Sequence, residues 1–458
     1  MRPTVIDGVA VSTVDSAGTE FAFGHVVVEG GRIAAVGPGQ APRPSGPHTW
    51  VDGSGCLVTP GLVNTHHHLY QWATRGLAQD VPLFQWLTAL YPVWRGLDAE
   101  STHGAASAGL ARLATTGCTT AADHHYVFPR EGGDQFGALV SAGRRIGLRL
   151  HAVRGSMDRG RSRGGLPPDD LVEETDAALA ATEEAIDTHH DPSPDALVRV
   201  AVGPCSPFSV SRELMVGAAE LARAKGVRLH THLAETTDEQ HRCRAEYGCT
   251  PTEYAERLGW LGADVWLAHT VHLSPEEVER LGATGTGSAH CPTSNGRLGT
   301  GIAPVRELLD AGAAVGLGVD GAASNESGGL VEELHQALLQ ARQRGGPEAL
   351  GVRQALWLAT MGGARCLGWQ DEIGSIEPGK LADLAVWRLD GLDHAGVDDP
   401  VAALVLGPRP RLKLLLVGGR TVVDDGELRT ASATELAREL RTAAARLKAT
   451  AERRGGIT

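Results

Sequence analysis

The 458-residue sequence contains 42 Lys and Arg residues against 55 Asp and Glu residues, a formal net charge of −13 at pH 7. This acidic balance, with no long Lys/Arg run, argues against nucleic acid as a partner and favours a small-molecule substrate. No apolar run approaches the roughly 20 residues that span a bilayer, and residues 1–10 lack a signal-peptide pattern, so we expect a cytoplasmic protein with no membrane partner.

The two ends of the chain show the same residue pattern. Residues 1–58 and residues 373–427 both read as short alternating strands joined by turns. Because the chain is longer than one compact domain usually is, we expect a large and a small domain. The sequence predicts a small β-sandwich domain built from residues 1–58 and 366–430, with the larger domain inserted between these segments.

The middle of the chain, residues 59–365, alternates short apolar runs with longer amphipathic stretches, which is typical of repeated strand-helix units. Eight candidate strands lie at residues 62–64, 119–122, 148–151, 198–203, 229–232, 265–269, 287–290 and 315–319. Helical patterns lie at residues 168–186, 211–225, 274–281 and 330–344. Eight such units predict an α/β fold, a (β/α)8 barrel of the TIM type, in which catalytic groups gather at the carboxyl ends of the strands.

Residues 431–458 are predicted to form a C-terminal helix and tail. Ser432 and Glu435 have the spacing of a capping box, and Leu436, Leu440 and Leu447 share one helical face. We expect this helix to dock on the body of the protein or on a partner.

Polar residues follow most of the predicted barrel strands. They are His66, His125, Arg154, Ser206, His232, His269 and Asp320. In the first strand-end segment, residues 60–68, alternation places His66 and His68 on the same side, so that both imidazoles can face one metal ion, whereas His67 points away.

Three further strand ends add to this pair. His232 ends the fifth strand and is followed by Glu235, His269 ends the sixth, and Asp320 directly follows the eighth. A carboxylate placed at the end of an apolar strand is costly unless it meets a cation. Together with His66 and His68, these residues indicate a metal site with catalytic carboxylates beside it.

On these residues the sequence resembles the amidohydrolase superfamily, in its mononuclear aminohydrolase branch, over essentially the full length. The resemblance rests on residues 60–68, 232–235, 268–269, 320–325 and 374–383. It implies that His66, His68, His232 and Asp320 bind one divalent metal ion, usually Zn²⁺ with Fe²⁺ as the alternative. It also implies a homo-oligomer.

In such a site we expect three residues to carry the chemistry. Asp320 would accept a proton from a water that the metal acidifies. Glu235 would protonate a ring nitrogen, and His269 would polarise the nucleophile or stabilise the tetrahedral oxyanion.

Within the superfamily the sequence is most similar to 8-oxoguanine deaminases, and guanine deaminases, adenosine/S-adenosylhomocysteine deaminases and s-triazine hydrolases are further relatives. The resemblance implies hydrolytic deamination of a purine-like aminoheterocycle, 8-oxoguanine to urate and ammonia. The alternatives are an s-triazine amino- or chlorohydrolase, a deaminase of guanine or another nucleobase and, more remotely, an inactive amidohydrolase-like scaffold.

Four residues are predicted to contact the substrate. Gln71 matches a glutamine that guanine-type deaminases use, although it could equally be a loop residue. Trp86 could stack on a planar ring or belong to the core. His125 is predicted to lie in the pocket rather than to be structural, and Arg154 either pairs with a substrate carbonyl or braces an acidic loop.

Overall fold

A parallel barrel occupies the centre of the molecule in the computed structural model, which describes residues 2–43 and 46–453. Its eight strands, each paired with the next, are β6 (Leu62–Asn64), β8 (Cys118–His125), β9 (Arg149–Ser156), β10 (Val198–Pro204), β11 (Arg228–Leu233), β12 (Val265–His269), β13 (Gly287–His290) and β14 (Val315–Leu317). The predicted parallel α/β barrel is therefore confirmed.

The barrel nearly closes between its first and last strands. The backbone N–H of Thr65 donates to the carbonyl of Leu317 at 2.9 Å, and that of Asp320 donates to the carbonyl of His66 at 3.1 Å. Just beyond these bonds, β7 (His67–His68) pairs in parallel with β15 (Asp320–Gly321). This seam brings the two ends of the barrel sheet together and places His68 beside Asp320.

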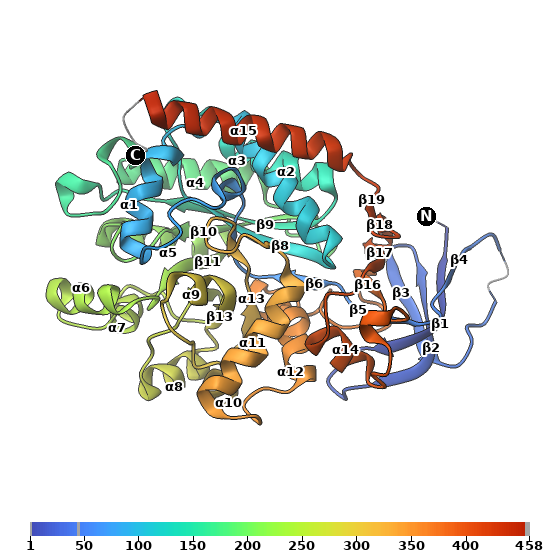
Figure 1. The fold of residues 1–458 in the computed structure, drawn as a ribbon. Helices are drawn as coiled ribbons and strands as arrows, with labels where there is room; N and C mark the ends of the chain where they lie inside the picture. The colour runs from blue at the N-terminus through green and yellow to red at the C-terminus, as the bar shows by residue number, and fades with distance from the viewer. Residues whose placement is uncertain (1, 44–45, 454–458) are drawn as a thin grey trace.

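Helices surround the barrel (Figure 1). They are α1 (Leu83–Trp94), α2 (Ala99–Thr115), α3 (Gln135–Ile146), α4 (Thr175–His189), α5 (Arg212–Lys225), α6 (Thr237–Tyr247), α7 (Pro251–Arg257), α8 (Pro275–Thr284), α9 (Pro292–Leu298), α10 (Val305–Asp310), α11 (Leu330–Gly345), α12 (Val352–Trp357) and α13 (Gly363–Leu367). Short helical turns, η1 (Leu69–Thr74), η2 (Arg161–Arg163), η3 (Asp169–Leu171) and η4 (Leu358–Gly362), complete this layer.

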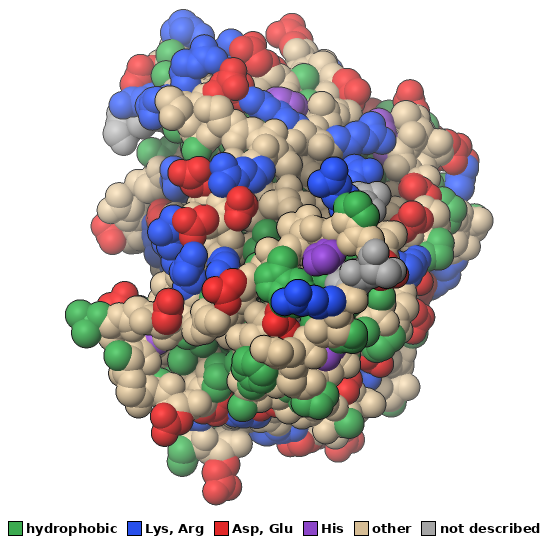
Figure 2. All heavy atoms as spheres, turned by 90° about the vertical axis from the view of Figure 1, so that its right-hand side faces the viewer, with side chains coloured by type: hydrophobic (Ala, Val, Ile, Leu, Met, Phe, Trp, Pro, Cys, Tyr) green, Lys and Arg blue, Asp and Glu red, His purple; other side chains and the backbone are tan. Residues whose placement is uncertain are grey.

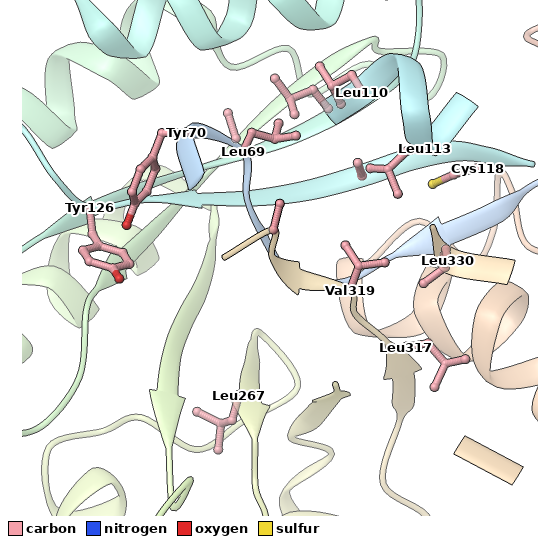
Figure 3. Close-up of a cluster of buried hydrophobic side chains, with 14 of the residues drawn as sticks. Leu69, Tyr70, Leu110, Leu113, Cys118, Tyr126, Leu267, Leu317, Val319 and Leu330 are labelled. Atoms are coloured by element: carbon pink, nitrogen blue, oxygen red, sulfur yellow. The ribbon is translucent and has the colours of Figure 1, made fainter. Parts of the chain in front are cut away.

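The main apolar core lies between the barrel strands and this helical layer. Figure 3 shows part of it, with Leu110 and Leu113 of α2, Leu267 of β12 and Leu317 of β14 directed into the same region. Each of these side chains is fully buried. Burial of one leucine stabilises the fold by about 1.5–3 kcal/mol.

Strands from both chain ends form a second sheet beside the barrel (Figure 1, right). Its strands are β1 (Thr4–Ser12), β2 (Glu20–Glu29), β3 (Arg32–Pro38), β4 (Thr49–Asp52), β5 (Cys56–Pro60), β16 (Leu384–Arg388), β17 (Leu412–Val417), β18 (Arg420–Asp424) and β19 (Glu427–Leu428). The antiparallel pair β5 and β16 joins the N-terminal to the C-terminal strands. The predicted β-structure shared by both chain ends is present, and its described strands are connected in one hydrogen-bonded sheet.

The predicted elements agree with the observed ones except at one helix. The strands predicted at 62–64, 265–269 and 287–290 have the observed bounds, and Ser211 and Ser274 cap α5 and α8. The helix predicted from residue 168 begins only at Thr175. The Asp169 carboxylate accepts bonds from the amide and hydroxyl of Ser162, which holds this segment in a loop and the short turn η3.

The C-terminal helix α15 (Ala433–Arg453) lies across α2, at the top of Figure 1. Leu436 and Leu447 of this helix are buried, while its Leu440 is partly buried. The predicted helix is therefore present and docks on the body of the protein; the tail beyond residue 453 lies outside the described residues. Two further helical segments, α14 (Pro400–Leu406) and η5 (Leu392–His394), connect β16 to β17.

The surface on the side of the second sheet mixes charges of both signs. Figure 2 shows Lys and Arg side chains interspersed with Asp and Glu across this face. Among the described residues, no helix is long and apolar enough to cross a membrane.

Candidate metal and catalytic site

The predicted site residues lie where the backbone leaves the barrel strands. Ala234, His269 and Asp320 adopt the left-handed region, with φ of 53°, 74° and 60°. Residues other than glycine rarely adopt this region, and such strain is concentrated at functional sites. Here it turns the chain sharply at the strand ends, so that buried polar side chains from four strands converge.

His68 and His232 face each other through their outer ring nitrogens. The Nδ1 atom of His68 lies 2.7 Å from the carbonyl oxygen of His124, and that of His232 lies 2.6 Å from the carbonyl oxygen of Cys205. Because a carbonyl can only accept, both Nδ1 atoms carry the proton and both Nε2 atoms present lone pairs. Burial lowers the pKa of both rings, that of His232 to about 3, so the rings are neutral.

The Nε2 atoms of His68 and His232 are only 3.0 Å apart. Two lone pairs at this distance repel unless a cation lies beside them. His66 adds a third such nitrogen, because its buried Nε2 has no hydrogen-bond partner among the described residues. It lies 3.4 Å from Oδ1 of Asp320, and Nε2 of His68 lies 3.3 Å from the same oxygen.

The Asp320 carboxylate is held in place by neighbouring donors. Its Oδ2 accepts a bond from the Ser294 hydroxyl at 2.6 Å, and its Oδ1 accepts one from the Gly321 amide at 2.7 Å. Burial would raise the pKa of Asp320, but the rings of His66, His269 and His68 keep it well below its usual range. An ionised carboxylate therefore faces three imidazole nitrogens.

This set of donors fits a divalent ion. His66, His68 and Asp320 form one group whose ligand atoms all lie within 4.8 Å of one another, and His66, His232 and His269 form another. Nitrogen ligands with one carboxylate are the combination that zinc binds in catalytic sites. The repelling nitrogens and the buried carboxylate are all neutralised by one cation at their centre.

Glu235 and His269 lie next to these donors. Their Oε2 and Nε2 atoms are 3.7 Å apart, and Nε2 of His269 lies 3.9 Å from Oδ2 of Asp320. Burial raises the pKa of Glu235 to about 7, and the charge of Asp320 contributes to this rise. Burial alone would lower the pKa of His269, but the carboxylates of Glu235 and Asp320 and a bond to Asn295 raise it. The site thus combines a carboxyl group that can be protonated near neutral pH with an imidazole that favours its charged form.

A cavity opens directly onto these groups, with about 410 Å³ of atom-free space including the part open to solvent. Its lining residues are His68, Gln71, Leu83, Trp86, Leu87, Tyr126, Cys205, Ser206, Phe208, His232, Glu235, His269, Leu298, Asp320 and Ser324.

Two of the four predicted substrate contacts lie at this cavity. Gln71 is fully buried on η1, and in the part of the chain that the structure describes neither its amide nitrogen nor its amide oxygen has a hydrogen-bond partner. Trp86 lies on α1, where its Nε1 donates to the carbonyl of Ala323 at 3.3 Å and its ring faces the cavity wall. The Gln71 amide is therefore free to bind a polar ring edge.

The other two predicted contacts do not line the cavity. His125 is buried, and its Nε2 lies 3.4 Å from the side-chain oxygen of Gln135. Arg154 forms two bonds to the Glu173 carboxylate, at 2.6 and 2.9 Å, and its guanidinium lies over the Phe128 ring. From their strand ends, the His125 side chain points toward the start of α3 and the Arg154 side chain points toward the loop that carries Glu173. For Arg154, the structure therefore favours the alternative of a brace to an acidic residue.

The residues at the site that were not predicted include three partners of the proposed ligands and catalytic groups. His230 contacts His66, Ser294 contacts Asp320, and Asn295 accepts a bond from Nδ1 of His269 at 3.0 Å. The repeated His-x-His spacing at 230–232 is a signal that could have identified His230. For Ser294 and Asn295, the only signal is their place after the seventh strand, on α9.

A model of the amidohydrolase family matches residues 57–422, most of the chain. The chain belongs to the amidohydrolase family. As an amidohydrolase with this buried set of donors, it is a metal-dependent aminohydrolase.

Two relatives of this amidohydrolase match along nearly their whole length. An 8-oxoguanine deaminase of Pseudomonas aeruginosa is 47% identical over 432 residues, which cover 93% of this chain and 95% of the relative. An isoxanthopterin deaminase of an unknown prokaryotic organism is 39% identical, with 90% of each chain covered.

Solved structures agree with this membership. The atrazine chlorohydrolase TrzN of Arthrobacter aurescens, complexed with zinc, superposes with a TM-score of 0.91 at 35% identity and covers 96% of this chain and 100% of its own. An adenosine deaminase of Xanthomonas campestris with bound zinc has a TM-score of 0.87 at 25% identity, covering 97% and 98%. The barrel is thus a scaffold that related proteins use with bound zinc.

Proposed function

We propose that this amidohydrolase removes an amino group from a purine-like heterocycle by hydrolysis, converting 8-oxoguanine to urate and ammonia. The observation that carries the proposal is a single cavity that joins a metal donor set, a carboxyl group with a pKa of about 7 and the unpaired amide of Gln71. The 47% identity to an 8-oxoguanine deaminase supports the choice of ring.

His66, His68, His232 and Asp320 are the proposed ligands of one divalent ion, for which zinc is the first candidate and Fe²⁺ the second. An ion held there supplies Lewis-acid chemistry and lowers the pKa of water toward neutrality. The carbonyls of His124 and Cys205 support this assignment, because they fix the tautomers of His68 and His232 with their lone pairs toward the ion.

Three residues carry out the proposed reaction. Asp320 accepts a proton as water attacks the amine-bearing carbon, and Glu235 donates one to the adjacent ring nitrogen. His269, whose Nε2 lies 3.7 Å from Glu235 and 3.9 Å from Asp320, stabilises the oxyanion that forms. A C–O bond forms, the C–N bond breaks after a proton passes to the amino group, and ammonia leaves.

Gln71 is the proposed reader of the ring edge. Its amide offers one acceptor and two donor hydrogens at the cavity wall, which match a ring that alternates carbonyl and N–H groups. Trp86 supplies an aromatic wall against which the planar ring can pack. Gln71→Leu should therefore raise KM more than it lowers kcat.

A panel of rings tests the proposal. Purified, zinc-loaded protein is incubated with 8-oxoguanine, guanine, isocytosine and an amino- or chloro-s-triazine, and ultraviolet absorbance and released ammonia are followed. We expect the highest kcat/KM with 8-oxoguanine. Release of no ammonia from any purine would refute the assignment.

A triazine substrate is the second candidate. The match to the atrazine chlorohydrolase at a TM-score of 0.91 favours it, as does 35% identity to a hydroxydechloroatrazine ethylaminohydrolase of a Pseudomonas species. Release of chloride or amine from the triazines, without turnover of purines, would establish this alternative.

A further inference from the structure

A chain of hydrogen bonds runs from the proposed metal site into the barrel interior. Nδ1 of His66 lies 2.7 Å from Nε2 of His230, and Nδ1 of His230 lies 2.8 Å from the carbonyl oxygen of Trp266. All three residues are fully buried, so no bulk water competes for these bonds. His230 is the middle member and lines no part of the cavity.

The donor and the acceptor of each bond follow from the group at the end of the chain, the Trp266 carbonyl. The Trp266 carbonyl can only accept, so Nδ1 of His230 carries the proton. Nε2 of a neutral His230 then carries a lone pair and can only accept. Nδ1 of His66 must therefore donate to it, which leaves Nε2 of His66 with a lone pair directed at the site.

We infer that His230 is a positioning residue that fixes His66 in the tautomer able to bind the ion. The inference deepens the proposed function, since it rests on His66 being a ligand. His66 differs in this respect from His68 and His232, whose Nδ1 protons are held by backbone carbonyls. Within residues 2–43 and 46–453, no such carbonyl bond fixes Nδ1 of His66, so its orientation depends on one replaceable side chain.

The alternative tautomer of His66 is available in this structure. With a proton on Nε2, the ring could donate to Oδ1 of Asp320, 3.4 Å away. That bond would occupy two ligand atoms at once and would have to break before an ion could bind. Without His230, we expect His66 to favour this form in the metal-free protein.

A matched pair of variants separates positioning from packing. His230 and His151 are both buried, and both rings lie against the Trp266 ring, with centroids 4.4 and 5.2 Å away. Of these two histidines, His230 bonds to His66 and His151 does not. His230→Phe should weaken zinc affinity by about 10–100-fold, the usual effect of losing a partner that orients a metal ligand. His151→Phe should leave zinc affinity within about threefold of the wild type, while His230→Gln, whose amide can accept from His66 and donate to Trp266, should restore most of it.

Zinc affinity is measured by competition with a chromophoric chelator, and the electronic spectrum of the cobalt-substituted proteins reports ligand geometry. Unchanged affinity and spectrum in His230→Phe would overturn the inference, and so would equal losses in His230→Phe and His151→Phe. The tautomer itself is read from ¹⁵N NMR of the metal-free wild type, where we expect the His66 proton on Nδ1. A proton on Nε2 would overturn the inference even if no variant folds, whereas failure of the wild type to bind any divalent ion would refute the proposed metal site instead.

Discussion

Two carboxyl groups at the cavity have environments that push their pKa values apart. Burial raises that of Glu235 to about 7, whereas the surrounding imidazoles hold that of Asp320 well below its usual range. A protonated acid and an ionised base therefore exist side by side near neutral pH. Such a separation is how active sites assign acid and base roles to the same residue type.

Glu235→Gln should abolish the acid without removing a ligand. We expect kcat to fall by about 10²–10⁴-fold, the usual contribution of general acid catalysis, with the zinc content unchanged. Asp320→Asn is the contrasting variant, because it should lower both activity and zinc content. Turnover by Glu235→Gln within about tenfold of the wild type would exclude the acid role.

Asp123 is a buried carboxyl group outside the cavity whose titration should affect stability. Its Oδ1 accepts a bond from the Leu69 amide, and its Oδ2 has no partner among the residues that the structure describes. Burial raises its pKa to about 8. The native state therefore holds a proton that the unfolded chain loses at its ordinary pKa of 3.8. The stability from the neutral group is complete below about pH 4 and is lost as the pH rises through about 8.

Asp123→Asn replaces this group by a neutral amide that can still accept the Leu69 bond. The melting temperature of the variant, relative to the wild type, should therefore increase as the pH rises from about 5 to about 9. Calorimetry of both proteins across this range measures the difference. A difference that does not change with pH would show that Asp123 is ionised in the native state throughout.

At the scale of the secondary-structure elements, a buried ion pair fastens the barrel to the second sheet. Arg149 is the first residue of β9, and Asp383 directly precedes β16. The Arg149 guanidinium donates two hydrogen bonds to the Asp383 carboxylate, 2.7 and 3.1 Å long. Its remaining nitrogen donates to the carbonyls of Asp195 and Ala196, and the carboxylate also accepts from the Gly418 amide. Both charges are thus paired and hydrogen-bonded where they are buried.

Removing one partner of this pair should leave the other charge buried without a counter-charge. Arg149→Met or Asp383→Leu is each expected to cost about 3–5 kcal/mol, measured by urea unfolding, because a lone buried charge is left behind. The double variant should cost less than the sum of the two single losses. Strictly additive losses would mean that the two side chains do not interact energetically.

The helix α15 supports the elements that carry Gln71 and Trp86. Its Leu447 is fully buried, and the helix contacts α2, η1 and α1. Leu447→Ala should destabilise the protein by about 2–5 kcal/mol, whereas Leu440→Ala, at a partly buried position, should cost less. Thermal unfolding of the two variants compares them, and equal losses would contradict this account of the helix.

Sequence patterns predicted the barrel strands well, because each strand is a short apolar run that ends in a polar residue. They placed the helix at 168–186 too early, because the Asp169 side chain binds Ser162, a local competition that periodicity does not record. Strand alternation correctly predicted that His66 and His68 share a face, because both lie in one segment. It could not predict the contact between His66 and His230, which depends on how strands far apart in the chain meet. The directions of the His125 and Arg154 side chains were missed for a similar reason, because each side chain is oriented by a partner in another segment, Gln135 at the start of α3 and Glu173 in a loop.

At the scale of the whole molecule, the proposed metal ligands come from separate parts of the barrel. Its ligand groups come from the seam between the first and last strands and from β11, with His269 of β12 beside them. An ion at their centre would therefore tie together segments that are distant in the sequence. Without an ion, the Nε2 atoms of His68 and His232 lie 3.0 Å apart with their lone pairs repelling each other.

Zinc should accordingly stabilise the whole fold and not only permit activity. A ligand that binds only the native state adds about 4 kcal/mol to stability when its free concentration is a thousand times its Kd. Urea unfolding in chelator-buffered zinc should show this gain for the wild type. His68→Asn, which removes a ligand, should lose most of it, while His290→Asn, at a buried histidine outside the donor groups, should keep it. Because the gain depends on native-state binding alone, its persistence in His68→Asn would mean that zinc binds elsewhere, and its absence from the wild type would mean that these side chains do not form a zinc site.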